Sequence, residues 1–156
     1  MAPIEAVREV PATREDVFAF LAALPNHWAL ANRWIEVVSL ESGPEAPRGG
    51  EFDRGIVRIR GPLGLRRTAR TRVLAADPPG RMSGSAQLGG TLATVTWDLE
   101  EANPGSRVRL SAEVEAASLP DRLLLSLGGR AWMRRHFATV LATLARQFES
   151  GRPERQ

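Results

Sequence analysis

The chain has 156 residues, of which 43% are hydrophobic and 25% charged, proportions that are typical of a globular protein. It contains no cysteine, which excludes disulfides, thiolate metal sites and cysteine nucleophiles. The formal charge is +3, and because the 21 basic residues, all arginines, are interleaved with 18 acids, we expect no nucleic-acid binding.

The first part of the chain is predicted to form one strand and two short helices. The strand has alternating apolar residues and stops at Pro11. Thr13 followed by Asp16 resembles a capping box at the start of the first helix, and Pro25-Asn26 separates this helix from the second. The three elements are expected over residues 4–10, 14–24 and 27–32.

Six further strands are expected after these helices. Segments rich in glycine and proline separate them, including the loop at 43–50, the hairpin turn at 61–64 and the turn at 77–80. The strands are predicted over residues 34–42, 51–60, 65–75, 81–87, 91–100 and 107–115.

A long amphipathic helix over 119–149 ends the ordered part of the chain. Its apolar face consists of Met133, Phe137, Val140, Leu141, Leu144 and Phe148. Gly128-Gly129 interrupts the helix, either as a kink or as a hinge beside a cavity mouth. We expect one domain over 1–149 and a disordered tail over 150–156.

This order of elements predicts an α+β fold. A curved antiparallel sheet wrapped around a single helix leaves a cavity between the two, which is a place for an apolar small molecule. No apolar run approaches the ~20 residues of a membrane span, and no secretion signal is recognisable. We therefore expect a cytoplasmic protein without stable membrane insertion.

Several segments resemble a known superfamily. They are VPATREDVFAFL at 10–21, LPNH at 24–27, Trp34, DPPGRM at 77–82 and GSRV at 105–108. Over about residues 2–149 the chain resembles the SRPBCC superfamily, which includes START domains, the birch-pollen-allergen group and polyketide cyclase/dehydrase-like proteins. The resemblance implies a helix-grip fold, in which a curved seven-stranded antiparallel sheet wraps around a long C-terminal helix and encloses an elongated cavity. Because the superfamily includes cyclases, lipid carriers, quinone-binding proteins and chaperone-associated domains, it does not select one function.

Strand alternation indicates which side chains face this cavity. On 65–75 the inward set contains Arg67, Ala69 and Thr71, which puts one arginine among small and apolar neighbours. The strand over 51–60 is ambiguous because both faces carry apolar residues, and a bulge at Gly55 would swap them. We expect Phe52 and Arg54 to face inward. The predicted ligand-binding residues are Trp28, Trp34, Phe52, Arg54, Arg67, Ala69, Thr71, Val95, Trp97, Leu110, Trp132, Met133, His136 and Phe137.

The candidates for catalysis are few. His27 and His136 are the only side chains that ordinarily titrate near neutrality, but no carboxylate partner is suggested by spacing, so both also fit a structural role. A buried Arg67 or Arg54 needs an acceptor, which is either a ligand oxygen or an internal carboxylate such as Asp53 or Glu36. Arg67, Arg54 and His136 are thus the catalytic candidates, and the catalytic residue stays open.

The sequence leaves three functional hypotheses. The first is binding of a hydrophobic, ring-containing small molecule, as in a polyketide cyclase/dehydrase-like protein. The second is a non-catalytic lipid or quinone carrier or sensor, and the third is a protein-binding, chaperone-associated module. We expect no metal and no cofactor; the oligomeric state is not determined by the sequence.

Overall fold

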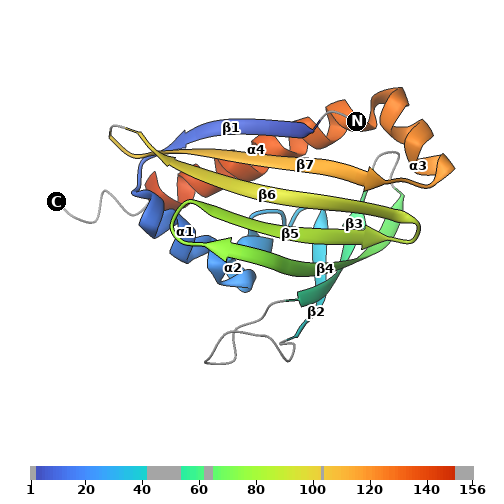
Figure 1. Cartoon of the computed structure of the whole chain (residues 1–156), viewed down its shortest axis with the longest axis horizontal. Helices are drawn as coiled ribbons and strands as arrows, with labels where there is room; N and C mark the ends of the chain where they lie inside the picture. Colours follow the sequence, from blue (N-terminus) through green and yellow to red (C-terminus); the bar gives the residue numbers. More distant parts are fainter. Residues whose placement is uncertain (1–2, 42–53, 62–64, 103, 150–156) are drawn as a thin grey trace.

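The computed structural model describes residues 3–41, 54–61, 65–102 and 104–149. Within these ranges the chain forms the predicted series of one strand, two short helices, six strands and a terminal helical segment (Figure 1). The elements are β1 (Ile4–Val10), α1 (Arg14–Ala22), α2 (Leu24–Ala29), β2 (Ile35–Glu41), β3 (Arg54–Arg60), β4 (Arg66–Asp77), β5 (Arg81–Leu88), β6 (Thr91–Glu101), β7 (Ser106–Ala116), α3 (Leu119–Leu124), η2 (Leu125–Gly129) and α4 (Arg130–Glu149). The expected tail at 150–156 lies outside the described residues, and the single-domain organisation stays a prediction.

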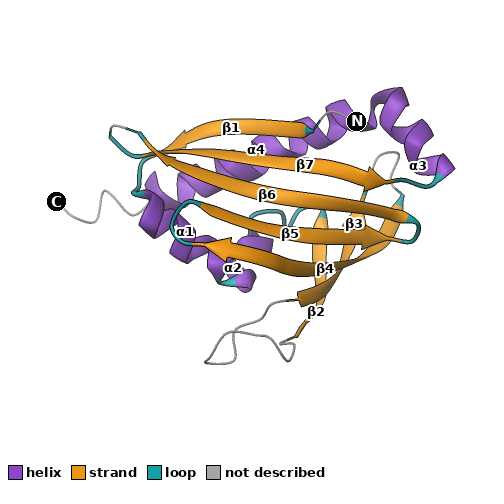
Figure 2. Ribbon diagram, in the orientation of Figure 1, coloured by secondary structure: helices purple, strands orange, loops and turns teal. Residues whose placement is uncertain are grey.

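The seven strands form one curved antiparallel sheet in the order β1-β7-β6-β5-β4-β3-β2 (Figure 2). Consecutive strands are neighbours except at one edge, where β1 pairs with β7 and Ile4 lies opposite Ala112. The helix α4 runs along one face of the sheet and packs against β1. This arrangement confirms the predicted helix-grip fold.

The hydrophobic core lies between α4 and the sheet. The side chains that α4 buries are Phe137, Val140, Leu141, Leu144 and Ala145. They join Ile4, Val10 and Val108 from the sheet, while Met133 and Phe148 pack at the border of the same cluster. Full burial of one such large apolar side chain stabilises a fold by about 1.5–3 kcal/mol, so this packing holds α4 across the sheet.

The boundary between the two short helices differs from the prediction. Thr13 caps α1 as expected, and its hydroxyl oxygen accepts a hydrogen bond from the backbone of Asp16 at 3.2 Å. However, α1 ends at Ala22 and α2 already begins at Leu24, so Pro25 lies in the first turn of α2. A proline there sacrifices no helical hydrogen bond, because the first N–H groups of a helix have no partner within it. Pro25 therefore starts the second helix, and the predicted range 27–32 is wrong.

The predicted break in the terminal helix is a kink at η2. Gly128 has a φ of 118°, which a residue with a side chain rarely adopts. A Cβ atom on Gly129 would lie 2.7 Å from the carbonyl oxygen of Leu124, so this position also requires glycine. Both glycines thus allow α3 to leave the line of α4. Hinge motion at this kink stays a prediction.

Among the described residues, no helix is both long enough and apolar enough to cross a membrane.

Candidate ligand-binding pocket

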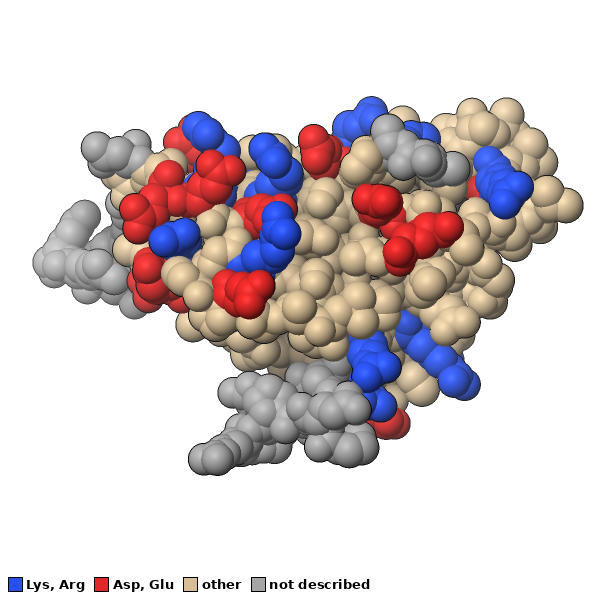
Figure 3. All heavy atoms as spheres, viewed as in Figure 1, with Lys and Arg blue, Asp and Glu red and all other residues tan. Residues whose placement is uncertain are grey.

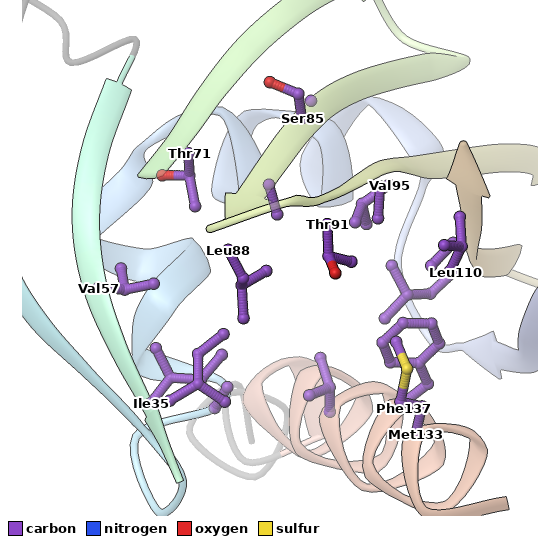
Figure 4. Close-up of a pocket in the computed structure, with 18 of the residues that line it drawn as sticks. Ile35, Val57, Thr71, Ser85, Leu88, Thr91, Val95, Leu110, Met133 and Phe137 are labelled. Atoms are coloured by element: carbon purple, nitrogen blue, oxygen red, sulfur yellow. The ribbon is translucent and has the colours of Figure 1, made fainter. Parts of the chain in front are cut away.

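A pocket of about 300 Å³ lies between the concave face of the sheet and the helices. Side chains from the strands β3–β7 and from α4 point toward its common space (Figure 4). The volume is at the lower end of the range for small-molecule sites. The residues labelled in Figure 4 are Ile35, Val57, Thr71, Ser85, Leu88, Thr91, Val95, Leu110, Met133 and Phe137.

The pocket wall is mainly apolar. Val57 and Ile59 of β3 form one side, and Met133 and Phe137 of α4 form another. All four tryptophans of the chain, at positions 28, 34, 97 and 132, also line it. A surface of this composition favours an apolar occupant over water.

One end of the pocket carries a partly buried ion pair. The Arg67 guanidinium donates from Nη1 to Asp121 Oδ1 at 2.5 Å and from Nη2 to the carbonyl oxygen of Leu88 at 3.2 Å. The Thr91 hydroxyl donates to the other carboxylate oxygen of Asp121. The Asp121 side chain is 9% exposed and that of Arg67 is 33% exposed. This network joins β4, β6 and α3 at the pocket.

The environment keeps Asp121 ionised. Burial by itself raises the pKa of a carboxyl group, but hydrogen bonds from Thr91 and Arg67 and the positive charge of Arg67 hold the pKa of Asp121 below its ordinary value. The carboxylate therefore neutralises Arg67 at neutral pH, and this end of the pocket is polar without a net charge.

His27 lies near the other end of the same wall. Its ring contacts Trp28 and Trp97 edge to face, with ring centroids 5.1 and 5.4 Å apart. Burial lowers the pKa of His27 to about 4, although a hydrogen bond with the Leu21 backbone raises it by a smaller amount. Its Nδ1 is enclosed and has no hydrogen-bond partner among the described residues. His27 is therefore a neutral imidazole at physiological pH.

This lowered pKa predicts a pH-dependent stability. Between the ordinary histidine pKa of about 6.5 and the folded value of about 4, the unfolded chain binds more protons than the folded one. The free energy of unfolding should therefore fall as the pH drops through this window. Urea unfolding of the wild type and of His27→Gln at neutral and mildly acidic pH will check this, because the variant should lose less stability on acidification. Parallel losses in both proteins would contradict it.

His136 lies in a second aromatic cluster. Its ring stacks on Trp132 with centroids 3.9 Å apart and meets Trp34 edge to face at 4.9 Å. Its Nδ1 donates to the carbonyl oxygen of Trp132 at 2.8 Å. His136 itself is not part of the pocket wall, whereas both tryptophans are. Its geometry fits the structural alternative for this histidine.

The structure brings together most of the predicted ligand-binding residues. Those in the pocket wall are Trp28, Trp34, Arg67, Thr71, Val95, Trp97, Leu110, Trp132, Met133 and Phe137. Ala69 is fully buried in the core and His136 lies outside the wall. Phe52 lies outside the described residues. Whether any of them binds a ligand stays a prediction.

Two expectations about the arginines need correction. Val57 and Ile59 line the pocket from β3 and Arg54 does not, so the inward phase assigned to Arg54 is wrong. Alternation along β3 then turns Arg54 away from the pocket. The alternative of an internal ion pair for Arg67 is confirmed, but with Asp121 as its partner, whereas Glu36 pairs with Arg58 at 2.9 Å.

Asp121 is the functional-site residue that the sequence analysis missed. It follows Ser118 by three residues, a spacing that resembles a capping box. The Ser118 side chain does cap α3, accepting from the Asp121 backbone at 3.4 Å. The carboxylate turns inward to Arg67 instead of back to the cap. The spacing therefore indicates the helix start but gives no sign of the ion pair.

Comparison with known proteins gives a family and a fold. A family model described as polyketide cyclase / dehydrase and lipid transport matches residues 1–149. Among solved structures, TTHA0849 from Thermus thermophilus has a TM-score of 0.73 and 20% identity, covering 97% of this chain and 99% of that chain. A START superfamily protein from Mycobacterium smegmatis has a TM-score of 0.65 and 14% identity, with 93% and 97% covered.

A third similar structure is DynU16, a protein of the dynemicin biosynthetic locus. It has a TM-score of 0.60 and 15% identity, and the match covers 97% of this chain but 48% of that chain. No curated protein matches the chain. At these identities the structural matches establish the fold alone, and the family match confirms the resemblance found in the sequence.

Proposed function

Since the chain belongs to the polyketide cyclase / dehydrase and lipid transport family, we propose that it binds a hydrophobic, ring-containing small molecule in the pocket between the sheet and α4. The observation that carries this proposal is the apolar pocket of about 300 Å³ with four tryptophans in its wall. Flat aromatic surfaces favour stacking or edge contacts with a ring. A volume at the lower end of the range for small-molecule sites suits a compact ligand.

The charge of the pocket favours an uncharged ligand. Asp121 neutralises Arg67, and His27 is neutral at physiological pH. Arg72 also borders the pocket, but this residue is exposed to solvent. A ligand carboxylate would have to compete with Asp121 for the guanidinium and would lose its hydration on entry. A ligand with carbonyl or hydroxyl groups avoids this cost. The Nε1 donors of Trp28, Trp34 and Trp97 have no partner among the described residues, which also favours a ligand with oxygen acceptors.

Two versions of this function differ in whether a bond changes. In a cyclase/dehydrase, the pocket would fold a flexible substrate into a reactive conformation, and Arg67 would stabilise a developing enolate oxygen. In a lipid or quinone carrier, the same pocket only holds its ligand. The neutral His27 and the position of His136 outside the wall supply no paired acid and base, which favours the carrier. A purely protein-binding module needs no internal pocket, so the space between the sheet and α4 also favours a small-molecule ligand over this third hypothesis.

A titration of tryptophan fluorescence with polyphenols, quinones and fatty acids tests the proposal. The chain has no tyrosine, so the emission comes from the four tryptophans that line the pocket. We expect saturable quenching by an uncharged ring compound. A flat response to all three classes would contradict the proposal.

Val95→Phe should then weaken binding at least about tenfold, because Val95 lies in the pocket wall and a larger side chain fills the space of the ligand. The matched control is Thr96→Phe, which places the same ring on the opposite face of β6, beside Thr94 and Asp98. The dissociation constants of both variants for the same ligand test whether the ligand binds in this pocket. Equal losses in the two variants would show that binding occurs elsewhere.

A further inference from the structure

The outer side of α3 and η2 is an unusual surface because it exposes three leucines. Leu119 is 77% exposed, Leu123 is 59% exposed and Leu127 is 75% exposed. Leu119 and Leu123 lie four residues apart, on the same side of α3, and Leu127 follows four residues later in the kinked segment η2. We call these three residues the leucine face. Contiguous exposed apolar surface of this kind marks an interaction site more often than scattered single residues do.

The ion pair between Asp121 and Arg67 explains why Leu119 and Leu123 point outward. In an α-helix each residue turns by about 100°, so Asp121 lies nearly opposite Leu119 and Leu123. Because Asp121 is buried and bonded to Arg67, that side of α3 must face the pocket. Leu124 and Leu125 flank Asp121 on this inner side and line the pocket. The helix therefore buries its one acid and exposes two of its leucines, Leu119 and Leu123, the reverse of an ordinary surface helix.

The exposed charges on α3 and on the first half of α4 are positive. From Arg122 to Phe148 the sequence contains five arginines and no aspartate or glutamate. Arg122 projects from α3 itself, and Arg134 and Arg135 are exposed on the first half of α4. In Figure 3 the end of the molecule that carries α3 shows a largely uncharged surface with one blue basic group on it, and a red acidic patch lies beside this end, over the sheet. Within this stretch of the sequence no acid lies among the arginines, and the nearest exposed acids before it are Glu113 and Glu115 on β7.

We propose that the leucine face and these arginines form a docking site for an anionic lipid surface. Leucine side chains at the boundary of a bilayer gain by burial among the acyl chains, and arginines beside them are attracted to anionic head groups. The attachment is peripheral: one short helix lies in the interface and the sheet stays outside. A second copy of the chain is a poorer occupant, because it would bring the same arginines against each other.

The position of the docking site places the membrane next to the pocket. Leu123 faces outward while the adjacent Leu124 lines the pocket, so the same turn of α3 borders both environments. Docking requires no ligand in the pocket. Failure of the ligand titration would therefore leave this proposal intact, and failure of docking would leave the binding proposal intact.

Co-sedimentation with lipid vesicles tests the proposal. Vesicles of phosphatidylcholine with phosphatidylserine should bind the wild-type protein, whereas vesicles of phosphatidylcholine alone should bind it at least about tenfold more weakly. Raising the salt from about 0.1 M to about 1 M shortens the screening length from about 10 to about 3 Å and should release the protein. Absence of binding to the anionic vesicles at the lower salt concentration would overturn the proposal.

Two sets of variants separate the contributions of the leucines and of the arginines to vesicle binding. The triple variant Leu119→Ser, Leu123→Ser, Leu127→Ser and the double variant Arg122→Glu, Arg134→Glu should each lower the partition coefficient about tenfold or more. The controls are Leu74→Ser, an exposed leucine on β4, and Arg8→Glu on β1. Controls that lose as much binding as the test variants would overturn the proposal. So would a wild-type dimer in light scattering that the leucine variant converts to monomers without any vesicle binding.

Discussion

Replacing Asp121 by alanine is expected to lower the free energy of unfolding by about 2 kcal/mol. Removal of one partner from a buried ion pair costs about 3–5 kcal/mol, because the other charge stays without compensation. The Arg67 side chain is 33% exposed and recovers part of its hydration, which reduces the expected loss. Thr91 also loses its acceptor. Urea unfolding near pH 7 measures the difference.

The control for this variant is Asp98→Ala. Asp98 accepts from Arg81 at 2.8 Å, but the side chains are 24% and 63% exposed, so this pair should contribute less than about 1 kcal/mol. Equal losses for both variants would show that the Arg67–Asp121 pair is no more than a surface ion pair.

The stabilising effect of Asp121 also has a pH window of its own. Because the pKa of Asp121 is lowered in the folded state, its contribution is complete above the ordinary aspartate pKa of about 3.9. This contribution is lost as the pH falls through the lower pKa that Asp121 has in the folded state. The wild type and Asp121→Ala should therefore converge in stability only in this acidic range, after the His27 window between about 6.5 and 4 has been passed.

The second large effect is expected for Leu144→Ala, with a loss of about 3 kcal/mol in the free energy of unfolding. Leu144 has no exposed surface and lies in the centre of the core between α4 and the sheet. Shortening it removes buried apolar contacts and leaves a cavity, for which losses of about 2–5 kcal/mol are typical. Thermal or urea unfolding measures the change.

Leu127→Ala is the matched control, since it is the same substitution in the same terminal segment. Leu127 is 75% exposed, so the expected change is within about 0.5 kcal/mol. A loss as large as that of Leu144→Ala would mean that the leucine face is covered in the folded protein, which would also contradict the docking site on α3.

The order of the elements could be predicted because local patterns determine it. Alternation over 4–10 predicts β1 with its observed bounds, and the turn at 77–80 separates β4 from β5 as expected. The boundary between α1 and α2 could not be predicted in the same way, because a proline can either end a helix or occupy its first turn. Only the backbone after Ala22 distinguishes the two cases.

The pocket could be predicted in part. Strand alternation places Arg67, Thr71 and Val95 in its wall, since each strand has one clearly apolar face. Alternation does not identify the inward face of β3, because Ile56 lies on one face and Val57 and Ile59 lie on the other. It also cannot reveal that Arg67 pairs with Asp121, because the two residues are 54 positions apart in the sequence and meet only after the sheet and α3 have formed.

The pairing of β1 with β7 has a consequence for how the protein is made. Ile4 and Val10 are almost fully buried, but their partners on β7 are Ala112 and Ser106. On the ribosome β1 therefore emerges long before the strand that covers its edge, while β2 to β7 can pair with neighbours in order of synthesis. The N-terminal strand keeps an unpaired edge, which is prone to aggregation, until the last strand and α4 arrive. The closing step of folding pairs β1 with β7, and the five other strands of the sheet lie between these two in the sequence.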